Sequence, residues 1–158
     1  ALRRHFIGHL QRRKVRKIIA KVSLIHSVDS WELAEEIDKR AADLNKIQEI
    51  LMQVNLGEEA AKSGLAAPEV PPLVEKIRSC RNLNLTGLMT LPPFDPDPEK
   101  SRPLFRELKL IAKSLKLPHL SMGMTNDFEV AIEEGATIIR IGTGIFGVNE
   151  KFVSGIYK

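Results

Sequence analysis

Cysteine, tryptophan and tyrosine each occur once in the 158 residues, and aromatic residues make up only 5% of the chain. The single cysteine, Cys80, excludes a disulfide within the chain and fits a reducing compartment. No apolar run approaches the roughly 20 residues needed to cross a bilayer. We therefore expect a protein of the cytoplasm, or of an organelle matrix, without a membrane partner.

The first 28 residues contain eight basic residues and no acidic ones. An organelle transit segment or a nucleic-acid contact would have the same composition. No nucleic-acid-binding motif accompanies the charge, so we interpret it as a solvated basic face and expect no nucleic-acid partner. The basic residues are Arg3, Arg4, Arg12, Arg13, Lys14, Arg16, Lys17 and Lys21.

Apolar or β-branched runs alternate with helical patterns along the whole chain. The runs predict strands over 5–10, 24–29, 49–56, 83–91, 119–124 and 137–141. Apolar residues at helical spacing predict helices over 11–20, 31–44, 69–80, 102–115 and 128–134. Strict alternation of this kind predicts an α/β fold with a parallel sheet and helical crossovers.

Two closures of such a sheet are possible. An open doubly wound sheet needs no further strands. A parallel (β/α) barrel of the TIM type needs eight strands. If the chain forms a barrel, residues 1–158 are one domain that lacks two βα units.

Small and hydroxylated residues follow the last two predicted strands. Ser121 and Gly123 lie at the end of one strand, and Gly142, Thr143 and Gly144 follow the other. Backbone N–H groups at such strand ends form anion sites, and parallel barrels often bind phosphate there. We therefore predict a phosphate-bearing ligand. Asp127, a poor neighbour for phosphate, is interpreted as a helix cap.

Arg140 lies within a run of isoleucines, so its charge needs a partner inside the fold. The spacing leaves two alternatives open. One is a structural ion pair with Glu133, Glu134 or another carboxylate, and the other is a bound ligand.

Several motifs occur in order along the chain: HFIGHLQ (5–11), LIHSVDS (24–30), GLMTLPP (87–93), SMGMTNDFEVAIEEGAT (121–137) and RIGTGIFG (140–147). Together they closely resemble the pyridoxal-phosphate homeostasis protein family. Its members have a single-domain barrel similar to the N-terminal domain of alanine racemases. This resemblance favours the barrel over the open sheet, with the chain supplying strands three to eight.

The resemblance implies that the chain binds pyridoxal 5′-phosphate (PLP) and takes part in vitamin B6 homeostasis, without catalytic turnover. Ser121, Met122, Gly142 and Thr143 would hold the cofactor on its phosphate side, and Arg140 would face the pyridine nitrogen. Neither catalytic residues nor a metal are expected. PLP-dependent apo-enzymes would be possible recipients of the cofactor, and the full-length protein would be a monomer.

The family carries its Schiff-base lysine on a first strand that has no counterpart in this sequence. We therefore expect a fragment that binds PLP non-covalently. Two alternative functions remain open: a PLP-dependent racemase-type enzyme, and a non-binding fragment that acts through protein contacts. A racemase needs a catalytic tyrosine, and the single tyrosine, Tyr157, lies near the end of the chain, far from the motifs.

Three histidines, His5, His9 and His26, raise the question of a metal site. No carboxylate or cysteine spacing completes a tetrahedral set around them. We expect histidines of the core or its surroundings, with His9 and Ser27 on the wall of the cofactor pocket opposite the phosphate site.

Overall fold

The structure is a computed structural model that describes residues 2–57 and 63–147. The expectation for Tyr157 and the end of the predicted domain 1–158 lie outside the described residues. No helix in the described part of the chain is long and apolar enough to cross a membrane.

Five parallel strands form one sheet in the order β1-β2-β3-β4-β5. Each strand therefore lies beside its neighbour in sequence, as successive βα units require. The parallel α/β fold is confirmed. The strands are β1 (His5–Phe6), β2 (Leu24–Val28), β3 (Gln48–Gln53), β4 (Leu83–Met89) and β5 (His119–Ser121).

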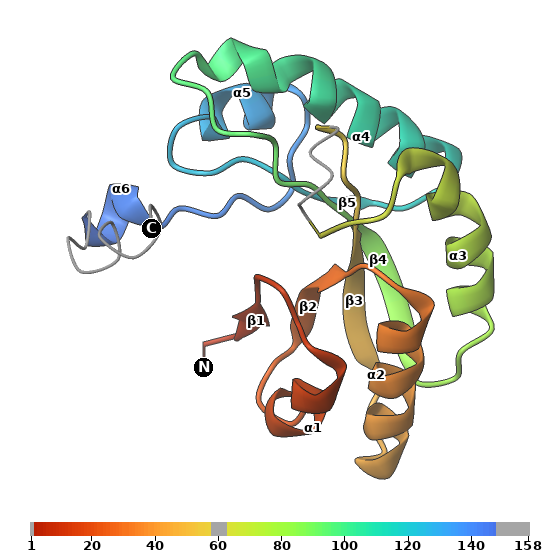
Figure 1. The fold of residues 1–158 in the computed structure, drawn as a ribbon. Coiled ribbons are helices and arrows are strands. Elements are labelled where there is room, and N and C mark those ends of the chain that lie inside the picture. The colour runs from red at the N-terminus through yellow and green to blue at the C-terminus, as the bar shows by residue number, and fades with distance from the viewer. Residues whose placement is uncertain (1, 58–62, 148–158) are drawn as a thin grey trace.

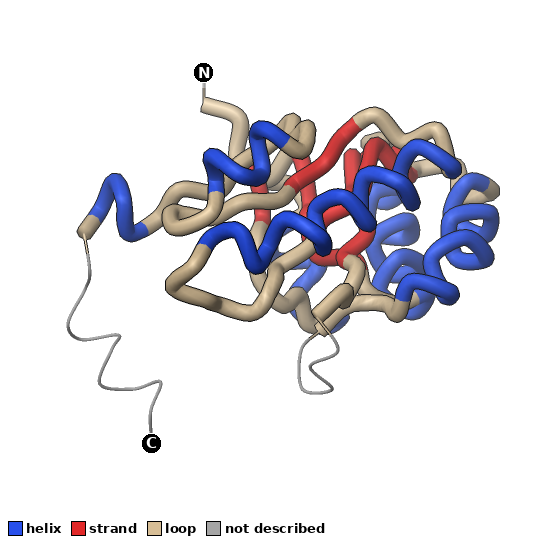
Figure 2. The backbone as a smooth tube through the Cα atoms, turned by 90° about the horizontal axis from the view of Figure 1, so that it is seen from above, coloured by secondary structure: helices blue, strands red, loops and turns tan. Residues whose placement is uncertain are grey.

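The crossover helices lie along one side of the sheet, which curls away from them (Figure 1). Seen from above, the strands run through the middle of the molecule with helices beside them (Figure 2). Helix α6 lies apart from the others in both views. The helices are α1 (Val15–Ile18), α2 (Trp31–Asp43), α3 (Val70–Arg78), α4 (Arg102–Ser114), α5 (Phe128–Glu133) and α6 (Thr143–Phe146), with 3-10 turns η1 (Arg12–Lys14), η2 (Ala67–Glu69) and η3 (Pro98–Ser101).

The two faces of the sheet differ in size and polarity of their cores. The helix-covered face forms the main apolar core, which includes Ile25, Ile50 and Leu88. A smaller cluster on the inner face contains Leu24, Leu51 and Met89, with Leu91 and Ile138 packed against it. Because side chains on a strand alternate between faces, polar residues two positions away from a member of this cluster also face inward.

Local sequence signals position two of the helices. The Ser30 hydroxyl accepts a hydrogen bond from the Leu33 N–H at 3.4 Å and caps α2. Pro71 and Pro72 fit the first turn of α3, where their missing N–H groups leave no acceptor unpaired.

Asp127 stands at the N-cap position of α5, yet its side chain caps no helix N–H. Its carboxylate accepts hydrogen bonds from the Met124 N–H at 2.7 Å and from the Ser101 hydroxyl at 2.8 Å. The predicted helix-capping role is wrong. Asp127 ties the turn before α5 to the end of η3 instead.

The predicted strand over 137–141 is the main correction to the fold. This segment runs beside β5 but forms only a single bridge, between Ser121 and Ile138. Backbone hydrogen bonds still connect the two, from Met122 N–H to Ile138 O at 3.1 Å and from Arg140 N–H to Gly123 O at 2.9 Å. β5 is only three residues long, which leaves too little ladder for a regular sixth strand.

The first predicted strand and helix are also shorter than expected. β1 ends at Phe6, and Gly8 has a φ of +92°, a conformation outside the strand region. The helix expected over 11–20 divides into η1 and the four-residue α1.

Candidate functional site

Ser121 and Arg140 meet on the inner face of the sheet, although 18 residues separate them in the chain. Both are buried, and Arg140 is 6% exposed. The Arg140 guanidinium donates from Nη1 to Ser121 Oγ at 2.6 Å and from Nη2 to the Thr90 carbonyl at 2.8 Å. Its Nε is buried and has no hydrogen-bond partner. One nitrogen of the guanidinium therefore has no acceptor among the described residues.

Gly123 makes this arrangement possible, because the chain turns sharply after β5. Its φ is +93°, and a Cβ at this position would lie 2.6 Å from the Ala131 Cβ. Only glycine adopts this conformation so close to α5 without strain. The turn brings the segment around Arg140 back alongside β5.

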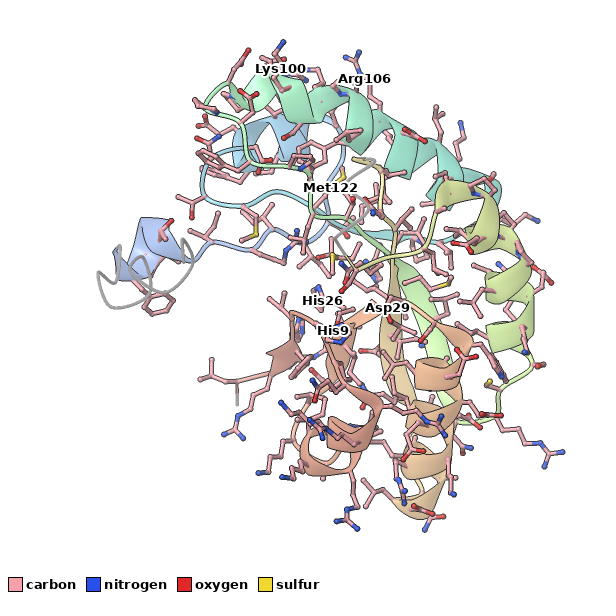
Figure 3. All side chains as sticks on the ribbon, viewed as in Figure 1. His9, His26, Asp29, Lys100, Arg106 and Met122 are labelled. Atoms are coloured by element: carbon pink, nitrogen blue, oxygen red, sulfur yellow. The ribbon has the colours of Figure 1, made fainter. Side chains whose placement is uncertain are left out.

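The charge of Arg140 is not balanced by an ion pair among the described residues. Glu133 and Glu134, the structural alternative predicted from the sequence, bind elsewhere. Arg102 contacts Glu133 at 2.6 Å and Glu134 at 2.8 Å, and Arg106 contacts Glu134 at 3.0 Å. Arg106 lies on the outer side of the molecule (Figure 3). The ion-pair alternative is therefore wrong.

Burial lowers the pKa of Arg140 to about 10, partly opposed by the negative charge of Asp127. The guanidinium still carries its proton at neutral pH. A buried cation that has no ion pair and an unpaired donor nitrogen strongly favours binding of an electron-rich or anionic group.

His26 completes the buried polar group, and sequence reasoning did not assign it to the site. Its Nδ1 lies 2.8 Å from Ser121 Oγ, and its Nε2 lies 3.1 Å from His5 Nδ1. Burial is the main cause that lowers the pKa of His26 to about 4, and the electrostatic influence of His5 and then of Arg140 acts in the same direction. The only signal for His26 in the sequence was a polar residue within the predicted strand 24–29.

Gly142 and Thr143 lie on a cavity of about 600 Å³. The Pro-rich segment after β4 and the turn before α5 form its other walls. The amide groups of Gly142 and Thr143 donate to no acceptor among the described residues. The cavity is lined by Leu91, Pro92, Pro93, Phe94, Asp95, Met124, Thr125, Asn126, Asp127, Gly142 and Thr143.

Met122 lies on the opposite side of the sheet from Ser121. Its side chain is fully buried in the main apolar core, and its N–H donates to Ile138 O at 3.1 Å. The structure thus brings Ser121 and Arg140 together and places Gly142 and Thr143 on a neighbouring cavity. The Met122 side chain joins neither group.

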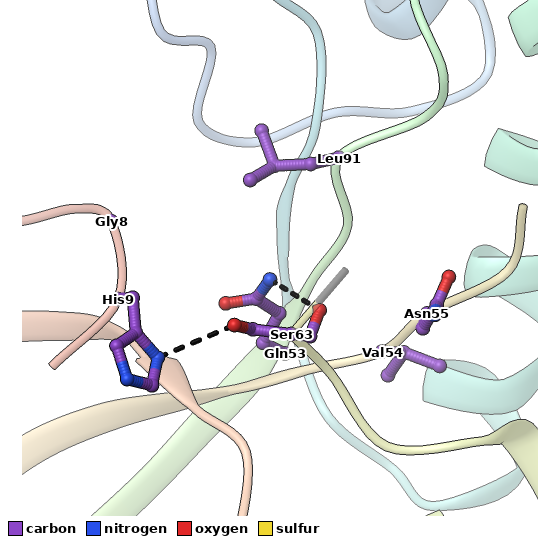
Figure 4. Close-up of a pocket in the computed structure, with 7 residues that line it drawn as sticks. All are labelled: Gly8, His9, Gln53, Val54, Asn55, Ser63 and Leu91. Atoms are coloured by element: carbon purple, nitrogen blue, oxygen red, sulfur yellow. Dashed lines mark hydrogen bonds between the residues drawn. The ribbon is translucent and has the colours of Figure 1, made fainter. Parts of the chain in front are cut away.

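A second cavity of about 200 Å³ lies near the ends of β1 and β3 (Figure 4). His9 lies within it, with Nδ1 3.3 Å from Ser63 Oγ and 3.8 Å from Asp29 Oδ2. Figure 3 shows His9 and Asp29 close together. Leu91 borders both cavities. His9 therefore lines this second cavity and not the one that holds Gly142 and Thr143, whereas Ser27 is buried with its hydroxyl unpaired.

Comparison with known proteins identifies the family of the chain. The family described as alanine racemase, N-terminal domain, matches residues 1–150. The pyridoxal phosphate homeostasis protein of Aquifex aeolicus is 50% identical over 149 residues, which cover 90% of this chain and 65% of that protein. The protein of the same name from Synechocystis is 40% identical over 149 residues, covering 90% of this chain and 68% of that protein.

Two solved structures show the same fold. PipY of Synechococcus elongatus PCC7942, solved with PLP bound, is 33% identical with a TM-score of 0.85, covering 92% of this chain and 71% of PipY. Alanine racemase of Clostridium difficile has a TM-score of 0.75 at 13% identity, covering 95% of this chain and 41% of that enzyme. The likeness to the racemase concerns the fold alone.

A curled parallel sheet with helices outside and polar residues gathered inside defines a domain of the (β/α)-barrel class. The chain belongs to the alanine racemase N-terminal domain family and, within it, to the pyridoxal phosphate homeostasis proteins. The resemblance drawn from the sequence motifs is confirmed. The chain spans about 65% of the length of the curated relatives that it matches.

Proposed function

We propose that this chain binds PLP non-covalently and serves vitamin B6 homeostasis rather than a catalytic reaction of its own. Two observations on relatives support this: their name, and the PLP bound to PipY. When bound to an enzyme, PLP acts as an electron sink for reactions of amino acids.

The observation that carries the proposal is the buried and incompletely paired guanidinium of Arg140. A guanidinium that is 6% exposed, lacks an ion pair and keeps an unpaired Nε needs an acceptor inside the fold. The pyridine nitrogen of PLP is such an acceptor. Since a guanidinium can only donate, it favours an unprotonated pyridine nitrogen. An unprotonated ring is a weaker electron sink, which suits a protein that holds the cofactor.

The phosphate would lie at Gly142 and Thr143, where two backbone amides are unpaired on the wall of the larger cavity. A phosphate oxygen is a strong acceptor for such amides. The hydroxyl of Thr143 would add a third donor. In the proposed set, Ser121 and Met122 act without donating to the phosphate: the Ser121 hydroxyl holds Arg140, and the Met122 N–H holds the segment around Ile138 beside β5.

The finer placement of the chain belongs to the same proposal. Its five strands and the segment around Ile138 would be strands three to eight of an eight-stranded barrel, in a single PLP-binding domain. PLP-dependent apo-enzymes would receive the cofactor, and the full-length protein would be a cytoplasmic monomer.

Titration of the chain with PLP, followed by protein fluorescence, tests the proposal. We expect saturable binding that Arg140→Leu weakens at least tenfold, because a hydrogen bond from a charged donor contributes roughly 1.5–3 kcal/mol. The matched control is Arg81→Leu, an exposed arginine outside the site. Equal affinities of the wild type and Arg140→Leu would refute the role of Arg140, and no saturable binding by the wild type would refute the function.

A further inference from the structure

Four polar side chains form a continuous line across the inner face of the sheet, from Arg140 to His5. The Arg140 Nη1 lies 2.6 Å from Ser121 Oγ, which lies 2.8 Å from His26 Nδ1. His26 Nε2 lies 3.1 Å from His5 Nδ1. Ser121 and His26 are 0% exposed, so water does not compete for their hydrogen bonds.

The chemistry of Arg140 determines which group donates and which accepts in each hydrogen bond of this line. A guanidinium has no acceptor, so Arg140 donates and the Ser121 oxygen accepts. The Ser121 hydroxyl proton then needs an acceptor, and His26 Nδ1 is the only other group bonded to this oxygen among the described residues. Nδ1 of His26 must therefore be unprotonated. Its proton sits on Nε2 and points to His5 Nδ1.

The opposite direction leaves a buried proton without a partner. If His26 carried its proton on Nδ1, the Ser121 oxygen would accept twice and its own hydroxyl would have no acceptor. An unsatisfied buried donor is unfavourable. A doubly protonated His26 would also place a second positive charge beside Arg140.

We propose that His26 is a positioning residue, which holds Arg140 in place by accepting the hydroxyl proton of Ser121. Ser121 binds Nη1 and the Thr90 carbonyl binds Nη2, which fixes the plane of the guanidinium, and Nε is its one nitrogen without a partner among the described residues. His26 itself touches no ligand in this proposal. Its consequence for PLP rests on the proposed function, whereas the hydrogen-bond direction stands independently of it.

The direction is tested on the ligand-free wild-type chain. Two-bond ¹H–¹⁵N correlation NMR distinguishes the two neutral forms of a histidine ring. We expect His26 as the Nε2–H form at pH 7, with a shift of its Nδ1 resonance in Ser121→Ala. Finding the Nδ1–H form, or a doubly protonated ring, would overturn the proposal.

The positioning role is tested by PLP titration of two variants. The Asn side-chain oxygen in His26→Asn replaces the acceptor at Nδ1, whereas His26→Leu fills the space without an acceptor. We expect His26→Asn to bind within about threefold of the wild type and His26→Leu to bind at least tenfold more weakly. The control is His119→Leu, an exposed histidine on the same strand as Ser121.

Equal affinities of the Asn and Leu variants, with native-like melting temperatures, would overturn the positioning role. If the wild type itself binds no PLP, the proposed function fails, and the NMR result alone decides the direction of the hydrogen bonds. The two failures are thus distinguishable.

Discussion

Arg140 and His26 lie two hydrogen bonds apart, through Ser121, yet carry different charges at neutral pH. Burial lowers the pKa of both, but Arg140 starts from an ordinary value high enough to keep its proton. His26 starts from 6.5 and therefore stays neutral. The inner face thus holds one buried positive charge and one neutral acceptor.

The neutral His26 predicts a loss of stability on acidification. The unfolded chain binds the His26 proton below pH 6.5, whereas the folded chain binds it only near its lowered pKa of about 4. The unfolded state therefore gains protons first, and the free energy of unfolding falls as the pH drops from 6.5 towards 4. We expect a decrease of up to about 3 kcal/mol, measured by urea unfolding across that range.

The matched variant for this measurement is His26→Asn, which has no titrating group between His5 and Arg140. Its unfolding free energy should change less between pH 6.5 and 4.5 than that of the wild type. Glu99 and Glu134, whose pKa values are lowered by hydrogen bonds from Arg102, lose their contribution only below that window. Parallel curves for wild type and variant would contradict the assignment to His26.

Removing the Thr143 hydroxyl of the proposed phosphate side together with the Ser121 hydroxyl that holds Arg140, in Ser121→Ala with Thr143→Ala, should weaken PLP binding at least tenfold. Because Ser121 also bonds Arg140, the double variant acts on both ends of the ligand. Pyridoxal, which lacks the phosphate, separates the effects: Thr143→Ala alone should weaken PLP but not pyridoxal. Unchanged PLP affinity of the double variant in a fluorescence titration would remove the phosphate assignment.

The residues of this site differ in how far sequence predicts them. A lone arginine among isoleucines signals a buried charge that needs a partner, so Arg140 was found. A histidine in an apolar strand looks like any core histidine, so His26 was missed. Its partners lie 21 and 95 residues away, and only the folded sheet brings them together.

At the scale of elements, the turn after β5 determines whether Arg140 reaches the inner face. Gly123→Ala should destabilise the protein by roughly 1–3 kcal/mol, since it combines a positive φ with a Cβ placed 2.6 Å from Ala131. The comparison is Gly142→Ala, where a Cβ would meet nothing within 4 Å and φ is −107°. Urea unfolding of the two variants measures the difference, and equal stabilities would contradict the strain at Gly123.

Elements with a long periodic pattern were predictable, and those that depend on a neighbour were not. The apolar stripe of 31–44 predicts α2 within one residue of its observed end. The run 137–141 has the composition of a strand, but regular pairing also needs a sufficiently long neighbour. β5 spans three residues, so the run forms one bridge instead. The composition of a segment indicates whether it can form a strand, but whether it pairs regularly also depends on the neighbouring strand.

At the scale of the whole molecule, helices cover one side of the sheet (Figure 1), and the inner side holds the polar groups. The inner apolar cluster is small, and Arg140, Ser121 and His26 lie near it. Leu91, which follows β4 near the carboxyl ends of the strands, lines both cavities. Ligands of parallel α/β domains bind at this edge, which agrees with the proposed PLP site.

None of the lysines described in the structure lines either cavity or contacts Arg140. We therefore expect that borohydride treatment of the chain with PLP, followed by mass spectrometry, gives pyridoxyl groups spread at low level over exposed lysines. Arg140→Leu should give the same pattern, because the reaction would not pass through the site. If one lysine were labelled stoichiometrically in the wild type and lost its label in Arg140→Leu, the cofactor would be held covalently, and the non-covalent mode would be wrong.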